Sequence, residues 1–124
     1  MKSVVVILNE QHSLLPDQER VLIETYGEGE YVFEKIPAEG LSLEQQDKLA
    51  WSLIVSDFRD ILFVSPVPAL MLFCTRYDFC TRYDTSAHNR VRVFHNDKRE
   101  KREINTPQGK KLISTVAPDG WKIV

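Results

Sequence analysis

The chain has 124 residues, of which 43% are hydrophobic, and its formal net charge is -2. This length and composition predict one α/β domain over residues 1–124, with a core that needs neither disulfides nor metal. A sequence pI near 5.9 argues against a protein that wraps long nucleic acid.

The first half alternates strand and helix signals. A strand is predicted over 3–8, followed by the polar loop Asn9 to Ser13 and a helix over 15–25 with Pro16 and Asp17 in its first turn. A second strand, 30–36, ends at Pro37. Ser42 and Gln45 then form a capping box for a helix that runs to about residue 57.

The second half begins with strand 60–64, whose continuous apolar run is typical of a central parallel strand. The turn 65–68 leads to a helix through 69–73, and a fourth strand covers 90–94. A polar cluster, a hairpin turning at 104–109 and a last strand over 121–124 follow. These elements predict an α/β fold: a Rossmann-like three-layer domain with a mainly parallel sheet and a C-terminal β-hairpin.

The hexapeptide at 73–78, FCTRYD, is repeated without change at 79–84. Six residues of helix turn through about 600°, so equivalent positions in the two copies point about 120° apart. The copies therefore cannot share one buried helical face. We interpret the repeat as a short duplication that lengthens the helix or fills the following loop.

The cysteines Cys74 and Cys80 have a spacing that matches neither a CxxC redox pair nor a zinc half-site. Both are expected to be small buried hydrophobes in a reduced, cytoplasmic protein. Val4 to Leu8 is too short to act as a signal peptide or to cross a membrane, and prolines interrupt the apolar stretch 61–74. We therefore expect no membrane partner.

The charge is distributed unevenly: residues 1–60 carry twelve acids and five bases, whereas 61–124 carry six acids and eleven bases. Half of the basic residues lie within 90–111: Arg90, Arg92, Lys98, Arg99, Lys101, Arg102, Lys110 and Lys111. This concentration predicts a local positive surface for a small, phosphate-bearing ligand.

Three polar loops follow predicted strands, at 9–13, 65–68 and 95–99. The carboxyl ends of parallel strands share one edge of a sheet, where ligands of α/β proteins bind, so we expect these loops to converge. The candidate ligand-binding residues are Asn9, Gln11, Ser13, Ser65, Asn96 and Asp97. The candidate catalytic residues are His12 and His95 for proton transfer, and Lys98 and Arg99, the strongest candidate, for neutralising a phosphate.

Each candidate also has a structural interpretation. Either histidine can instead cap a strand or bond a carbonyl group, and Ser65 can cap a helix. Asn96 and Asp97 suit a simple turn, and the charges at 98–103 suit a solvated edge strand. His88 is expected in an exposed polar loop.

Several motifs are absent. The chain lacks G-x-G-x-x-G, G-x-x-x-x-G-K-[ST], H-E-x-x-H and G-x-S-x-G. Their absence disfavours ordinary dinucleotide and P-loop binding, zinc hydrolysis and serine esterase chemistry. We expect no cofactor and no metal.

The layout resembles the small CRISPR-associated Rossmann-fold proteins of the ring nuclease and CARF-like kind, which act on or sense cyclic oligoadenylate. The features that carry the resemblance are HSLLPDQ at 12–18 after the first strand, a strand ending at Pro37, FVSP at 63–66, and a late strand running into KRE at 98–100.

The resemblance implies an antiviral protein that forms a homodimer whose symmetric cleft binds cyclic oligoadenylate. Metal-independent cleavage there would leave a 2',3'-cyclic phosphate. Arg99 and Lys98 would neutralise the phosphate, and His12 or His95 would transfer a proton. Asn9, Ser65 and Asn96 would hold the ring. The alternative is a non-catalytic accessory protein whose basic hairpin docks an acidic partner.

Overall fold

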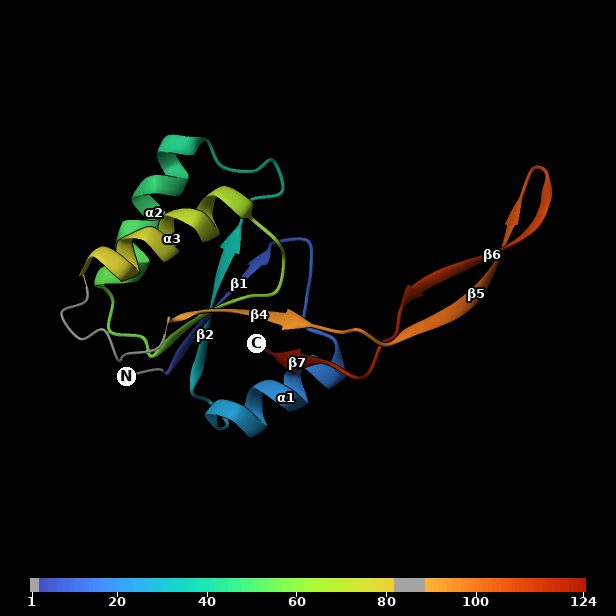
Figure 1. The fold of residues 1–124 in the computed structure, drawn as a ribbon, viewed down its shortest axis with the longest axis horizontal. Helices are drawn as coiled ribbons and strands as arrows, with labels where there is room; N and C mark the ends of the chain where they lie inside the picture. Colours follow the sequence, from blue (N-terminus) through green and yellow to red (C-terminus); the bar gives the residue numbers. More distant parts are fainter. Residues whose placement is uncertain (1–2, 82–88) are drawn as a thin grey trace.

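The computed structural model describes residues 3–81 and 89–124 (Figure 1). The elements in chain order are β1 (Val4–Asn9), α1 (Pro16–Tyr26), β2 (Tyr31–Ile36), α2 (Leu43–Val55), β3 (Asp60–Phe63), α3 (Pro68–Thr81), β4 (Val91–His95), β5 (Arg99–Thr106), β6 (Gly109–Val116) and β7 (Lys122–Ile123). His88 and the last three residues of the second hexapeptide lie outside the described residues, so the expectation of an exposed loop at His88 is untested.

The main sheet has five strands in the order β2-β1-β3-β4-β7. β1, β2, β3 and β4 run parallel, and β7 pairs antiparallel with the end of β4. The chain moves outward from β1 to β2 through α1 and then crosses back to β3 through α2. Right-handed crossovers in opposite directions place helices on opposite faces of a sheet. The predicted mixed α/β fold, with a mostly parallel sheet and a C-terminal antiparallel hairpin, is confirmed.

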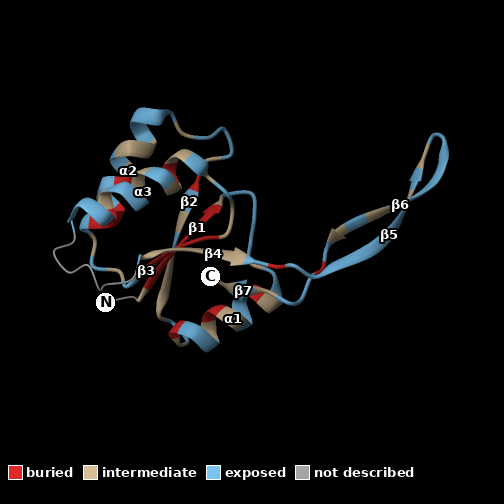
Figure 2. Cartoon of the chain, viewed as in Figure 1, coloured by how far each residue is buried: buried red, intermediate tan, exposed pale blue. Residues whose placement is uncertain are grey.

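Alternating side chains of the central strands fill two cores, one on each face of the sheet. Val5, Ile7, Ile61 and Phe63 pack with α2 and α3. Val4, Val6 and Leu62 pack with Leu22 and Tyr26 of α1. Because successive residues of a strand point to opposite faces, a strand covered on both sides is apolar along most of its length. Figure 2 shows the resulting band of burial through β1 and β3.

The helix starts follow the local sequence. Ser42 accepts a hydrogen bond from the backbone N–H of Gln45, whose side chain accepts one from the N–H of Ser42, so the predicted capping box is confirmed. Pro16 and Asp17 occupy the first turn of α1 as predicted. Within the described residues, no helix is long and apolar enough to span a membrane.

The repeated hexapeptide lengthens α3, which extends to Thr81 rather than stopping near Phe73. In the first copy Cys74 is fully buried, whereas in the second copy Cys80 is exposed and the Phe79 side chain is 80% exposed. The expectation that both cysteines are buried is therefore wrong for Cys80. Cys74 and Cys80 lie on one continuous helix, and positions six residues apart on a helix point about 120° apart, so only one of the two faces the core.

The basic residues of 90–111 do not form one positive surface, contrary to the prediction. Arg90 is a structural cation: its guanidinium bonds the buried carboxylate of Asp78 at 2.8 Å and donates to the carbonyl of Ile54, near the end of α2. Arg92 lies 3.8 Å from the buried carboxylate of Asp60. Both arginines thus hold elements together, because a buried carboxylate needs a counter-charge.

β5 and β6 form a separate two-stranded sheet, which we call the arm and define as residues 99–116. The arm projects away from the five-stranded sheet (Figure 1). Its strands are longer than expected, because β5 continues to Thr106 and the turn is confined to residues 107–108 before Gly109. The charged stretch predicted as an edge strand is thus one side of a free-standing hairpin.

Candidate functional site

The loop after β1 is shaped by its own polar groups. The Asn9 side-chain oxygen accepts a hydrogen bond from the N–H of Gln11 at 2.9 Å, and the Asn9 carbonyl accepts one from the N–H of His12. Glu10 bonds to the carboxyl end of β2 through its own N–H and to Ala38 through its carboxylate. These bonds fix the loop above the carboxyl end of β1.

Ser65 connects this loop to the end of β3. Its hydroxyl lies 3.4 Å from Nδ1 of His12 and accepts a 3.4 Å hydrogen bond from the N–H of Asn9. β1 and β3 are neighbours at the point where the chain changes direction across the sheet, which is where open α/β sheets form their binding crevice. The predicted convergence of the first two loops is therefore confirmed.

Trp121 supplies a third side of the site from the C-terminal segment. The backbone N–H of Trp121 donates to the carboxylate of Asp17 in the first turn of α1 at 3.1 Å. The Trp121 ring packs edge to face against Phe94, with 6.1 Å between the ring centroids. Its indole nitrogen is buried and has no hydrogen-bond partner among the described residues. A buried donor without a partner costs about 1 to 3 kcal/mol.

These elements line an open hollow of about 510 Å³ on the surface, which we call the rim pocket. Its lining residues are Gln11, His12, Ser13, Leu15, Gln18, Val64, Ser65, Pro66 and Trp121. The volume lies within the range of about 300 to 1,000 Å³ typical of small-molecule sites. The lining combines a few polar groups with an aromatic ring and contains no charged side chain other than that of His12 when protonated.

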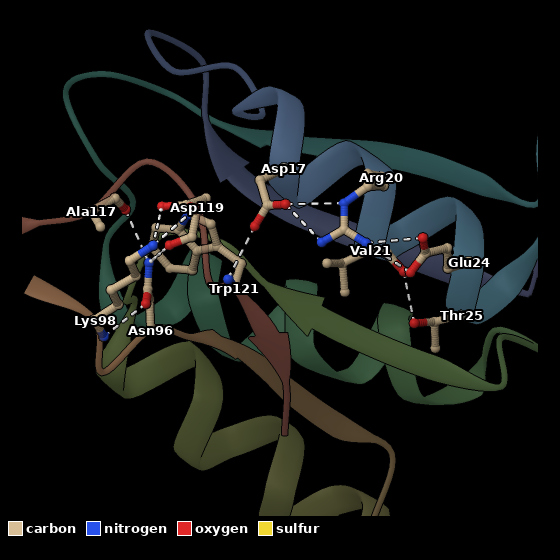
Figure 3. Close-up of polar contacts among 10 residues, drawn as sticks. All are labelled: Asp17, Arg20, Val21, Glu24, Thr25, Asn96, Lys98, Ala117, Asp119 and Trp121. Atoms are coloured by element: carbon tan, nitrogen blue, oxygen red, sulfur yellow. Dashed lines mark hydrogen bonds and ion pairs between the residues drawn. The ribbon is translucent and has the colours of Figure 1, made fainter.

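The carboxylate of Asp17, beside the rim pocket, is already engaged. Asp17 bonds to Arg20 and to the N–H of Trp121 (Figure 3), and these contacts lower the pKa of its carboxyl below the usual value. Its negative charge compensates the N-terminal dipole of α1. The first turn of α3, which follows Ser65, contains no acidic residue. An anion therefore meets less competition at the start of α3 than at the start of α1.

The third predicted loop does not reach the rim pocket. Asn96 is buried, and its amide donates to the carbonyls of Ala117 at 2.9 Å and Asp119 at 2.7 Å, while its oxygen accepts from the N–H of Lys98. Figure 3 shows this cluster. The two donated bonds join the segment that follows β4 to the segment that precedes β7. The interpretation of Asn96 as a structural turn residue therefore agrees with the structure, whereas its interpretation as a ligand contact does not.

Lys98 and Arg99 also lie outside the rim pocket. The Lys98 ammonium pairs with the exposed carboxylate of Asp119 at 2.9 Å, and the Arg99 guanidinium donates to the carbonyls of Asn96 and Lys98. The predicted placement fails because the chain leaves the sheet at Asn96 and enters the arm directly, which carries these cations outward.

His95 and Asp97 are exposed and do not line the rim pocket either. Since side chains alternate along a strand, His95 projects from the face of the sheet opposite to that of Phe94, whose ring contacts Trp121. The expectation that His95 faces the same site as His12 therefore does not agree with the structure.

Five lining residues were not predicted as site residues, and two of them, Trp121 and Gln18, have polar side-chain groups. Gln18 is 4% exposed, and its side-chain oxygen accepts from the N–H of Leu15 at the start of α1. A glutamine three residues after a helix start is a sequence signal for this bond. Nothing local in the sequence indicates that Trp121 packs against α1, 104 positions away from Asp17.

The chain matches no known family model, no curated protein and no solved structure. Within residues 3–81 and 89–124, no three His, Cys, Asp or Glu side chains gather as a potential metal site.

Proposed function

We propose that the rim pocket binds a small nucleotide-type anion on a Rossmann-like sheet, and that this ligand is a cyclic oligoadenylate. The observation that carries the proposal is the meeting of His12, Ser65 and Trp121 in an open hollow of about 510 Å³ at the carboxyl ends of β1 and β3. An aromatic ring provides a surface for base stacking. The start of α3, free of acidic residues, suits a phosphate.

The same residues support metal-independent phosphodiester cleavage. His12 accepts the proton of a ribose 2'-hydroxyl, the 2'-oxygen forms a bond to the adjacent phosphorus, and the bond from phosphorus to the 5'-oxygen breaks. Water supplies the proton for the departing 5'-oxygen, and the products carry a 2',3'-cyclic phosphate and a 5'-hydroxyl group. Ser65 orients the imidazole, and the pocket contributes by positioning the reacting groups.

The proposal includes a homodimer, because two equivalent pockets suit a ligand made of repeated units. It also includes a role in CRISPR-associated antiviral defence in the cytoplasm. The proposed site differs in its residues from the site expected from the sequence. The proposed site contains His12 and Ser65. It does not contain the predicted residues Lys98, Arg99, His95, Asn96 and Asp97.

The test uses the full chain with labelled cyclic tri-, tetra- and hexa-adenylate in EDTA. We expect at least one ring to bind by titration calorimetry and to be cleaved. His12→Ala should abolish cleavage and retain binding, and Trp121→Ala should weaken binding by about tenfold, the equivalent of one lost stacked base. Linear diadenylate distinguishes recognition of the ring from recognition of the base.

His95→Ala is the matched control, since it removes an exposed histidine that the rim pocket does not use. Both cleavage and binding should persist in it. Binding without cleavage by the wild-type chain would reduce the function to sensing. No binding of any ring, or equal binding by wild type and Trp121→Ala, would overturn the proposal.

A second candidate function is that of a non-catalytic interaction protein. The observation that favours it is the arm, which extends from the body with five basic and two acidic residues over 99–116. A basic hairpin that forms a two-stranded sheet of its own is suited to dock an acidic partner.

A further inference from the structure

Hydrogen bonds join the two chain segments at the base of the arm. Asn96, buried between the two strands that enter and leave the arm, bonds to Lys98, Ala117 and Asp119, and the N–H of Ala117 donates to the carbonyl of Lys98 at 3.1 Å. We call these four residues and Gly120 the arm root. The root fixes the direction of the arm, which lowers the entropy lost when the arm binds.

The two faces of the arm differ. Opposite residues of paired strands share a face, so the register places Arg99, Lys101, Glu103, Asn105, Lys110, Leu112, Ser114 and Val116 together. All eight are exposed, the Leu112 side chain by 66%. This surface, which we call the cationic arm face, carries three basic residues and one acidic residue around two apolar side chains. An isolated hairpin is at best marginally stable in water, so an arm with this exposed apolar surface gains stability from a partner.

The body of the same chain has the opposite charge. Residues outside the arm include eleven basic and sixteen acidic residues, which gives -5 against +3 for the arm, in agreement with the total of -2. The segment 16–30 is the most acidic, with five acids and Arg20 as its one base. Glu24 and Glu28 in this segment are exposed, and Glu24 forms an exposed ion pair with Arg20 at 2.9 Å, which an arm can compete for. The surface complementary to the arm is therefore present on every copy of this chain.

The base of the arm lies beside α1, the most acidic helix of the same chain. The arm leaves the body beside the start of α1, where Trp121 bonds to Asp17 (Figures 1 and 3). Eight residues of strand extend about 27 Å, whereas the eleven residues of α1 extend about 16 Å. One arm is thus long enough to cover the outer surface of an entire α1 and the turn after it.

We propose that two copies of this chain associate by reciprocal exchange of their arms, with the cationic arm face of each copy on the acidic α1 surface of the other. The contact is isologous, so both arms are covered and the pair closes on itself. The inference rests on the homodimer of the proposed function and specifies its interface. The test measures association alone, so a monomeric chain would refute the dimer, whereas ligand binding by the rim pocket is decided separately by titration calorimetry.

A duplex nucleic acid is the competing occupant, because a two-stranded ribbon fits a major groove. The observations favour the second copy. The acidic body would repel a polyanion, and exposed Leu112 and Val116 indicate a partner surface that buries apolar groups.

The test measures mass by size-exclusion chromatography with light scattering. Wild type should have twice the chain mass of 14.4 kDa. An arm-reversed chain, Lys101→Glu with Lys110→Glu, and a body-reversed chain, Glu24→Lys with Glu28→Lys, should each dissociate at least tenfold more readily. An equimolar mixture of the two should regain the dimer, because each arm then meets a body of opposite charge.

The matched control is Arg102→Glu with Lys111→Glu, which makes the same change of charge on the other face of the arm and should affect association less. Circular dichroism checks that each variant is folded. A monomeric wild type, a mixture that stays monomeric, or arm-dependent binding of duplex DNA in place of dimerisation would overturn the proposal.

Discussion

The side-chain amide of Asn96 donates to the backbone carbonyl of Ala117, and this 2.9 Å bond joins the strand that enters the arm to the strand that leaves it. The same side chain makes two further hydrogen bonds: it donates to the carbonyl of Asp119 and accepts from the N–H of Lys98. One residue therefore connects the sheet, the arm and the wall of the rim pocket that contains Trp121.

Asn96→Ala should lower the free energy of unfolding by about 3 kcal/mol, because it leaves buried carbonyl and N–H groups without partners. Urea denaturation measures the change. Lys98→Ala is the control: it removes only an exposed ion pair with Asp119 and should cost less than about 1 kcal/mol. Equal effects of the two substitutions would show that the buried amide does not stabilise the root.

Gly120→Ala should destabilise the arm root more than the same change elsewhere. Gly120 has φ of 89°, and a Cβ there would lie 3.1 Å from the side-chain oxygen of Asn96. Gly40 has φ of 85° with nothing within 4 Å of an added Cβ. Gly40→Ala should cost about 1 to 2 kcal/mol from backbone strain alone, and Gly120→Ala more, as measured by thermal unfolding of both variants.

The two cysteines should react at very different rates with a thiol reagent. Burial raises the pKa of the Cys74 thiol to about 12, so little thiolate forms near neutral pH, and the side chain is inaccessible. Cys80 is exposed. Spectrophotometric titration should show one fast thiol that disappears in Cys80→Ser and a second that reacts only on unfolding. Two fast thiols in the folded chain would contradict the placement of α3.

Tyr26 should contribute to alkaline unfolding. Burial, followed by the hydrogen bond to Asp60, raises the pKa of its hydroxyl well above the unfolded value of 10.0. The folded state then holds this proton more tightly, so the contribution to stability is complete below pH 10 and is lost as pH rises above it.

Tyr26→Phe should cost about 1 to 3 kcal/mol at neutral pH, because Asp60 loses its 2.7 Å bond. The fall in stability between pH 10 and 11 should be shallower than in wild type. Urea titrations at both values test this difference. An unchanged pH dependence would show that Tyr26 is not protonated preferentially in the folded state.

The parts of the fold that follow from local patterns were predictable. The capping pair Ser42 and Gln45 and the continuous apolar run of β3 depend on residues adjacent in the sequence. The convergence of His12 and Ser65 followed from one general rule, that parallel strands end at the same edge. These predictions needed no knowledge of side-chain packing.

The errors concern residues whose position depends on distant contacts. Lys98 and Arg99 follow a strand end in sequence, but the buried amide of Asn96 directs the chain away from the rim. No local signal distinguishes an asparagine that binds carbonyls 21 and 23 positions later from one that faces a ligand. Trp121 was missed for the same reason.

The bond between Trp121 and Asp17 joins positions 104 residues apart. Closing a loop of that length carries an entropic cost that only contacts formed elsewhere can offset, and long-range pairings of this kind slow folding. The rim pocket should therefore be completed late in folding, after β1, β3 and α1 are in place. In a Trp51→Phe chain the remaining indole fluorescence comes from Trp121. Its change in intensity or wavelength as the ring packs beside Phe94 reports that final step in a stopped-flow refolding experiment.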